Sequence, residues 1–128
     1  ISFQHEGSTQ GWFDFKKLDR AFSNLLQNAC EAAPPASGKV EVKARGTDHH
    51  IEIFVADNGD GIPESVRNDI FQPFVTYGKE GGTGLGLAVA QKIIRDHGGE
   101  VKVQSTGNEG TTFALTLPVA PSTKAPNP

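Results

Sequence analysis

Two glycine-rich clusters constrain this chain most, because glycines at such density mark turns and close backbone approaches rather than the interior of a helix or strand. The clusters are Asp57-Asn58-Gly59-Asp60-Gly61-Ile62-Pro63 and Gly81-Gly82-Thr83-Gly84-Leu85-Gly86-Leu87. In the first, the glycines would let backbone approach a flat ring beside the Asp57 carboxylate, which suits an adenine amine. In the second, glycines precede or open a helix, where free amides and the positive end of the dipole attract phosphate. The two clusters together predict a nucleotide site.

Each cluster also has an ordinary structural explanation. The Asn58-Gly59 dipeptide is a strong type I′ turn signal, so a hairpin is the alternative for the first cluster. Close helix packing is the alternative for the second. Its Gly-x-Gly-x-Gly spacing differs from the dinucleotide fingerprint, and Gly38-Lys39-Val40 lacks the other parts of a P-loop. Neither of these common nucleotide folds is predicted.

The helix expected from Phe15 carries two asparagines on one face. Its apolar stripe recurs every three or four residues until Pro34-Pro35 forbids continuation, and consists of Phe15, Leu18, Phe22, Leu25, Leu26 and Ala29. Asn24, Asn28 and Glu31 follow one another at i, i+4 and i+7, so their side chains share a polar face. The two amides could offer neutral oxygens to a metal ion. Ordinary solvation of a polar face is the alternative.

The remaining pattern predicts strands and further helices. Strands are expected over Val40 to Arg45, Ile51 to Ala56, Glu100 to Ser105 and Thr112 to Leu117, the last two joined by a turn over 106–110. Helices are expected over Glu64 to Ile70 and Leu85 to Asp96, with His97 on the terminal carbonyls of the second. A short extended segment is expected at the start of the chain, and a solvated turn at Asp48-His49-His50. Residues 72–83 are expected to be mobile.

Size and composition narrow the function classes. The 128 residues fit one domain, and 12 basic against 15 acidic side chains give a net charge of −3 with no basic run that could track nucleic acid. Cys30 is the only cysteine, which excludes a disulfide framework and fits a reducing cytoplasm. No apolar run approaches the roughly twenty residues of a membrane helix. We expect a cytoplasmic chain with no nucleic-acid partner and no membrane span, although its parent protein can still be membrane-anchored.

Five short motifs, in order, resemble the boxes of the catalytic ATP-binding domain of sensor histidine kinases. They are Asn24-x-x-x-Asn28-Ala29, Asp57-x-Gly59-x-Gly61, Phe71-x-Pro73-Phe74, Gly82-Thr83-Gly84-Leu85-Gly86-Leu87 and Gly110-Thr111-Thr112-Phe113. The resemblance implies an α/β two-layer sandwich of the GHKL, or Bergerat, type. Such a fold has a mixed, mostly antiparallel sheet of about five strands with three helices on one face. We expect this domain over residues 1–118, followed by a disordered Pro-rich tail over 119–128.

The resemblance also implies roles for individual residues. In the first glycine cluster it implicates Asp57, at the adenine, together with Gly59, Gly61 and Ile62. It places Asn28 on magnesium and Asn24 near the phosphates, which are surrounded by Gly82, Thr83, Gly84, Leu85, Gly86 and Leu87. Residues 71–81 would form a lid, in which Lys79 could swing toward the triphosphate. For the third-box threonine we favour Thr111 over Thr112, because alternation puts Thr111 on the face of Phe113.

One residue separates a kinase from a hydrolase in this resemblance. The related ATPases have a water-activating glutamate four residues before the magnesium asparagine, whereas this chain resembles the kinases in having Asn24 there. An amide cannot accept that proton, so ATP would stay intact until a nucleophile is brought in line. The implied activity is magnesium-ATP-dependent transfer to a histidine on a separate dimerisation domain, absent from this chain, and onward to a response regulator by phosphorelay. Asn24 and Asn28 are its expected catalytic residues.

Two other functions stay open on these residues alone. A serine kinase of the anti-sigma type shares the boxes, and a nucleotide-sensing module without transfer activity would need only the binding residues. The chain also departs from the resemblance at Glu31-Ala32, where many histidine kinases place a basic residue for phosphate and an aromatic near adenine. Those two contacts are not expected here.

Overall fold

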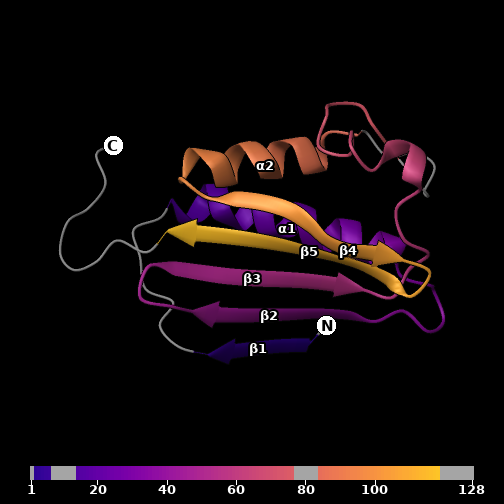
Figure 1. Ribbon diagram of the computed structural model, residues 1–128, viewed down its shortest axis with the longest axis horizontal. Coiled ribbons are helices and arrows are strands. Elements are labelled where there is room, and N and C mark those ends of the chain that lie inside the picture. The colour runs from indigo at the N-terminus through magenta and orange to yellow at the C-terminus, as the bar shows by residue number, and fades with distance from the viewer. Residues whose placement is uncertain (1, 7–13, 77–83, 119–128) are drawn as a thin grey trace.

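A five-stranded sheet with two helices on one face forms the chain, in a computed structural model that describes residues 2–6, 14–76 and 84–118 (Figure 1). The strands are β1 (Ser2–Glu6), β2 (Val40–Gly46), β3 (His50–Asp57), β4 (Glu100–Gly107) and β5 (Gly110–Pro118), and the helices are α1 (Phe15–Ala32) and α2 (Gly86–Asp96). The strand order is β1-β2-β3-β5-β4, with β1 parallel to β2 and every other pair antiparallel. The predicted two-layer α/β sandwich with a mixed, mostly antiparallel sheet is confirmed.

The predicted helices α1 and α2 both form, although α2 begins at Gly86, one residue later than predicted, and leaves Leu85 exposed. The Asp14 carboxylate accepts a hydrogen bond from the Lys17 amide and caps α1, which stops just before Pro34-Pro35. The core joins the apolar faces of both helices to β4 and β5, and its buried members include Leu18, Leu25, Leu87, Ile94, Phe113 and Leu115. This packing holds the two helices against the sheet.

His97 joins the end of α2 to the beginning of α1. Its Nδ1 lies 2.8 Å from the carbonyl oxygen of Ile93, and its Nε2 accepts a hydrogen bond of 3.1 Å from the backbone amide of Asp14. The predicted contact of His97 with the terminal carbonyls is confirmed. The bond to Asp14, from a residue 83 positions away, was not predicted.

The helix predicted over Glu64 to Ile70 is wrong. This segment forms only a 3₁₀ turn at Glu64–Val66, followed by further turns. Its amides bond to carbonyls three residues back, as in the bond from Asp69 to Val66. Asn68 and Asp69 favour such turns over a helix interior, and only Ile70 of this segment is fully buried. Two α-helices and one 3₁₀ turn therefore account for the helical part of the described residues.

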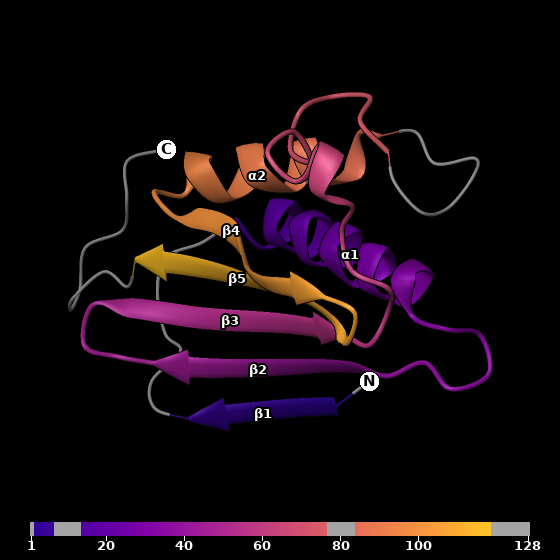
Figure 2. The ribbon, with the colours of Figure 1, turned by 45° about the vertical axis from the view of Figure 1, so that its right-hand side comes forward.

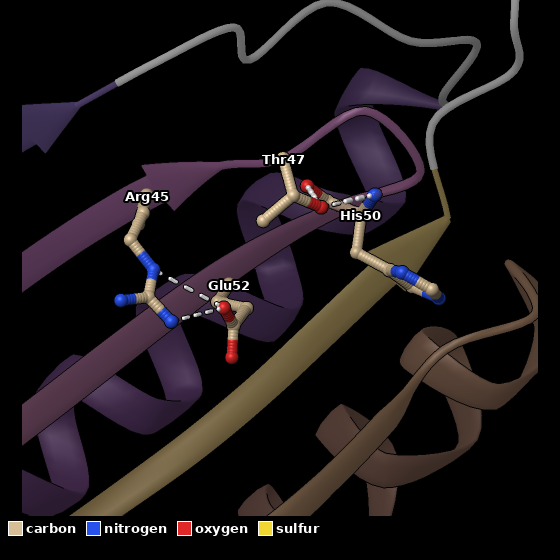
Figure 3. A network of polar contacts seen from close by, with 4 residues as sticks. All are labelled: Arg45, Thr47, His50 and Glu52. Atoms are coloured by element: carbon tan, nitrogen blue, oxygen red, sulfur yellow. Dashed lines mark hydrogen bonds and ion pairs between the residues drawn. The ribbon is translucent and has the colours of Figure 1, made fainter.

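The β2–β3 connection is a self-contained turn, as predicted for Asp48-His49-His50. The Thr47 amide donates to the His50 carbonyl oxygen at 2.7 Å, and the Thr47 hydroxyl accepts from the His50 amide at 3.0 Å. Beside it the Arg45 guanidinium pairs with Glu52 at 2.8 Å (Figure 3). His50 begins β3, whereas Asp57 ends it, so this turn lies at the opposite end of the strand from the candidate site. Across the described part of the chain, no three His, Cys, Asp or Glu side chains are grouped to hold a metal ion.

The β4–β5 hairpin is tighter than predicted. Its strands run to Gly107 and from Gly110, so the loop is Asn108-Glu109 instead of the whole of 106–110. The register shifts by one residue between Val103 and Ser105, which leaves Gln104 as a bulge.

Residues 77–83 of the expected mobile stretch and the expected tail 119–128 lie outside the described residues. Neither helix in the described ranges has the length and apolar character to cross a membrane.

Candidate functional site

Several loops meet at one end of the sheet, where β3 ends and the β4–β5 hairpin turns (Figure 2). A Cβ atom on Gly59 would overlap the carbonyl oxygen of Ala32 at the end of α1. One on Gly61, whose φ is +87°, would overlap the carbonyl oxygen of Gly107 in the hairpin. Gly110, with a φ of +130°, lies equally close to the backbone of Asp57. Glycine is therefore needed here so that three loops can pack around the end of β3.

The loop after Asp57 does not form the alternative hairpin. No strand returns after β3, and the chain proceeds to the 3₁₀ turn instead. The Asn58 side chain is anchored to the loop before β2, since its Oδ1 accepts from the Lys39 amide at 2.7 Å and its Nδ2 donates to the Ser37 carbonyl at 2.9 Å. This anchoring fixes the direction in which the chain leaves Asp57.

Asp57 is a buried carboxylate with one oxygen unused. Its Oδ1 accepts a hydrogen bond of 2.9 Å from the Gly59 amide, while Oδ2 has no hydrogen-bond partner among the described residues. Burial raises the pKa of this carboxyl, and the amides of Gly59 and Thr111 partly oppose that rise. A buried acceptor without a donor is costly, so such a group calls for an explanation. A ligand that donates a hydrogen bond at this point would supply one.

Two threonines line up beside Asp57 across the sheet. Thr111 of β5 pairs in register with Asp57 of β3 on one side and with Thr106 of β4 on the other. Thr111 is buried, and its Oγ1 lies 2.8 Å from the Oγ1 of Thr106. Thr106 Oγ1 also accepts a hydrogen bond of 2.8 Å from the Ile62 amide. The predicted residues Asp57, Ile62 and Thr111 are thus brought together, although the Ile62 side chain itself belongs to the core.

Thr106 was not among the predicted site residues. It stands five residues before Thr111 in a stretch that was predicted to be turn. The signal that could have found it is the two-residue hairpin loop, because a tight hairpin fixes which residues of its strands face each other.

The asparagine face of α1 lies against the start of α2. Asn24 Nδ2 donates a hydrogen bond of 3.1 Å to the carbonyl oxygen of Gly86, and a Cβ on Gly86 would sit 3.9 Å from the Asn24 side chain. Asn28 is half-buried one turn further along α1 and makes a polar interaction of its own. Asn24 is therefore the asparagine that contacts the second glycine cluster, and Asn28 follows it one turn later on the same face of α1.

The second cluster opens α2 as predicted. Gly84 has a φ of +74°, and its carbonyl oxygen accepts a hydrogen bond of 2.8 Å from the Phe74 amide. Leu85 is exposed next to Gly86, whereas Leu87 is buried and belongs to the core. The remaining predicted phosphate contacts, Lys79, Gly82 and Thr83, lie outside the described residues.

A separate hollow of about 410 Å³ lies between residues 67–71 and β4, and its lining includes Arg67, Phe71, Lys102 and Thr106. Of the neighbouring residues Asp57, Thr111 and Thr106, only Thr106 lines this hollow. None of the predicted phosphate residues lines it, so we do not identify it with the phosphate end of the site.

The arrangement offers different chemistry at each end. At the sheet, a buried carboxylate oxygen can accept from an amine. At the start of α2, backbone amides suit an anion, and the neighbouring asparagine oxygens suit a hard cation. An amine-bearing ring joined to phosphates matches both ends.

Comparison with known proteins relates this chain to sensor and histidine kinase proteins. Residues 13–121 match the family described as histidine kinase-, DNA gyrase B- and HSP90-like ATPases. The C4-dicarboxylate transport sensor protein DctB of Rhizobium meliloti (strain 1021) is 45% identical over 102 residues, which cover 79% of this chain but 16% of that protein's length. The mycobacterial sensor histidine kinase MprB superposes with a TM-score of 0.80 at 31% identity, over 95% of this chain and 86% of that one. The catalytic domain of histidine kinase ThkA, in a nucleotide-free form, gives 0.78 at 30% identity, over 94% and 80%.

Proposed function

This chain belongs to the family of histidine kinase-, DNA gyrase B- and HSP90-like ATPases, as a histidine kinase catalytic domain, and from that premise we propose that it binds magnesium-ATP and transfers the γ-phosphoryl group to a histidine of a separate dimerisation domain. The family is one of ATP-binding domains. What we propose beyond family membership is the magnesium ion, the histidine that receives the phosphoryl group, and the role of each residue. The observation that carries it is the buried Oδ2 of Asp57, which lacks a hydrogen-bond donor at the junction of three loops.

Adenine is the proposed ligand at the sheet end of the site. Its exocyclic amine would donate to Asp57 Oδ2, which satisfies the buried acceptor. Thr111 stands beside Asp57 in the same row and is the proposed third-box threonine at the base. Gly59, Gly61 and Ile62 shape this end of the site through the loop packing already described.

The phosphates are proposed to lie at the start of α2. The backbone of Gly84, Leu85, Gly86 and Leu87 opens this helix, and its dipole favours negative charge there. Gly82, Thr83 and Lys79 complete the proposed set. Asn24 is held beside Gly86 by its hydrogen bond, which supports the proposed role of Asn24 near the phosphate groups.

Magnesium fits the donor set of the α1 face. Mg²⁺ prefers oxygen ligands and is usually bound through few protein groups together with substrate phosphates. We propose that the amide oxygen of Asn28 holds it. When bound, the ion neutralises charge on the phosphates during transfer.

Transfer to a histidine, rather than hydrolysis, is proposed because of the residue at position 24. Asn24 already donates to the Gly86 carbonyl and cannot act as a base toward water. The chain's role would be to hold ATP until an imidazole is brought in line, and a response regulator would then receive the phosphoryl group. The serine-kinase and sensing-module alternatives are not favoured, because the relatives reported above are histidine kinase or sensor proteins. A cytoplasmic location is proposed from the need for ATP.

The proposal is tested by supplying this chain with the histidine-bearing dimerisation domain of its parent protein. Binding of ATP is measured first by calorimetry, with and without magnesium. Transfer is then followed with γ-labelled ATP, and the linkage is identified by its lability to acid. We expect acid-labile phosphohistidine on the added domain. Acid-stable phosphate, or tight ATP binding without any transfer to a folded acceptor domain, would contradict the proposed activity.

A further inference from the structure

The row Asp57, Thr111 and Thr106 runs across three adjacent strands. The register pairs Asp57 with Thr111 and Thr111 with Thr106, so their side chains stand on one face in neighbouring positions. Asp57 and Thr111 are 8% and 4% exposed, which removes both from competition with bulk water. Asp57 presents an acceptor, Oδ2, that has no partner among the described residues.

The hydrogen bonds of Thr106 restrict what Thr111 can do. A hydroxyl has one hydrogen to donate and lone pairs to accept with. Thr106 Oγ1 already accepts from the Ile62 amide at 2.8 Å, which fills one of its two acceptor positions and leaves its own hydrogen to give. The Oγ1 of Thr111, at 2.8 Å, stands in position to accept it. In that arrangement the hydroxyl hydrogen of Thr111 is released to point at a ligand.

We propose that Thr106 is a positioning residue for base recognition, which orients the Thr111 hydroxyl as a donor toward the ring nitrogen N1 of adenine. The row then presents an acceptor and a donor side by side. This pattern is complementary to the edge of adenine, where the exocyclic amine donates and N1 accepts. A base with a carbonyl oxygen and a ring N–H in those places, such as hypoxanthine, presents the reverse pattern. The inference rests on the proposed ATP-binding function and extends it by naming the residue that sets this polarity.

The inference assigns Thr106 no contact with the nucleotide. Its effect passes through Thr111, and the Ile62 amide favours donation by Thr106 because it already occupies one of the two lone pairs of that oxygen. A purely structural role for Thr106 would instead affect every nucleotide equally. The two roles are separated by a nucleotide that lacks only the N1 acceptor.

The experiment compares ATP with 1-deaza-ATP, in which a C–H group replaces N1, by calorimetry on the whole chain. The wild-type chain is expected to bind ATP more tightly, by the roughly threefold to tenfold that one hydrogen bond contributes. Thr106→Val should weaken ATP binding by a similar factor and leave 1-deaza-ATP binding unchanged. Thr106→Ser, which keeps the hydroxyl, should restore the preference for ATP. Thr112→Val removes a hydroxyl from the opposite face of β5 and should leave both affinities unchanged.

Each outcome is decisive. No ATP binding by the folded wild-type chain would overturn the proposed function itself. Equal affinity of the wild-type chain for the two nucleotides would overturn the donor role of Thr111, whether or not the Thr106→Val variant folds. Equal weakening of both nucleotides by Thr106→Val would show a structural role only, and an unchanged preference for ATP in that variant would remove Thr106 from base recognition.

Discussion

The side chain of Asn24 donates a hydrogen bond of 3.1 Å to the carbonyl oxygen of Gly86, and so joins the middle of α1 to the first turn of α2. This bond places the residue that we propose distinguishes kinase from hydrolase directly beside the proposed phosphate site. Because the amide uses its N–H₂ group for this bond, its oxygen is the part that can face a ligand or metal ion. The contact explains why an amide, rather than a carboxylate, suits this position.

Replacing Asn24 by glutamate should introduce a base for water at the cost of this contact. We expect increased ATP hydrolysis without any acceptor, since a carboxylate can accept the proton that an amide cannot. We also expect stability to fall by about 1 kcal/mol, because a carboxylate cannot donate to the Gly86 carbonyl. Released phosphate and urea unfolding measure the two effects. Asn24→Gln is the matched control, and hydrolysis no faster than in that control would contradict the assignment.

Replacing Asp57 by asparagine should weaken ATP binding by roughly tenfold to a hundred-and-fiftyfold, because a hydrogen bond to a charged group contributes about 1.5–3 kcal/mol. Calorimetry measures the change. Asp60→Asn, an exposed carboxylate in the same loop, removes the same charge without touching the buried acceptor and should bind ATP normally. If both variants bind alike, Asp57 is not at the base.

The raised pKa of Asp57 predicts opposite effects of pH on binding and on stability. Protonation removes the charged acceptor, so ATP affinity should fall as pH decreases through the raised pKa. The folded chain holds this proton to a higher pH than the unfolded chain does. The contribution of Asp57 to stability is therefore present at low pH and lost as pH rises from about 3.8 through the folded value. Urea unfolding of the wild-type chain and Asp57→Asn should show a difference that changes over this window, and a difference independent of pH would contradict it.

Replacing Asn28 by alanine should abolish the strengthening of ATP binding by magnesium. The ion would lose one of the few protein oxygens available to it, whereas contacts with the base would remain. Affinities for ATP with magnesium and with excess chelator give the measurement. Gln27→Ala, an exposed neighbour on α1, serves as the control. A magnesium effect that survives in the Asn28 variant would move the metal to other ligands.

Replacing Gly61 by alanine should destabilise the chain by more than about 1 kcal/mol, because its φ of +87° is unfavourable for alanine and the new Cβ would overlap the Gly107 carbonyl. Gly107→Ala is a matched control from the other side of the same contact, since no atom lies within 4 Å of a Cβ there. Thermal unfolding compares the two. Equal stability of both variants would show that the loop tolerates a side chain at position 61.

The elements with long, regular patterns were predictable from the sequence. The apolar stripe of α1 from Leu18 onward and the alternation of β2 correspond to faces turned toward the core, because periodicity reports on which side of an element meets the core. The helix expected over Glu64 to Ile70 failed for the same reason, since its short span has too few apolar residues to define a face. Its turns are instead held by backbone hydrogen bonds between residues three apart.

The candidate site was predictable in its residue types and less so in its contacts. Motif order located Asp57, Asn24 and Thr111. It could not show that Gly59 and Gly61 are required by the packing of loops against Ala32 and Gly107, since those contacts join residues far apart in the sequence. Nor could it find Thr106, whose importance depends on a register fixed by the hairpin.

The position of Asp57 at the end of the middle strand ties the proposed recognition of the base to the order of this end of the sheet. Asp57 ends β3, the middle strand, which has two strands on each side, and Thr111 follows on the neighbouring β5. Central strands open only when a protein unfolds globally, whereas loops and frayed ends open on their own. Asp57 and Thr111 form the last pair of the β3–β5 ladder, so fraying of this end of the sheet would separate the proposed acceptor from its neighbouring donor. The loops packed around Asp57 oppose that fraying, so variants that loosen them should lose the proposed base selection before the domain unfolds.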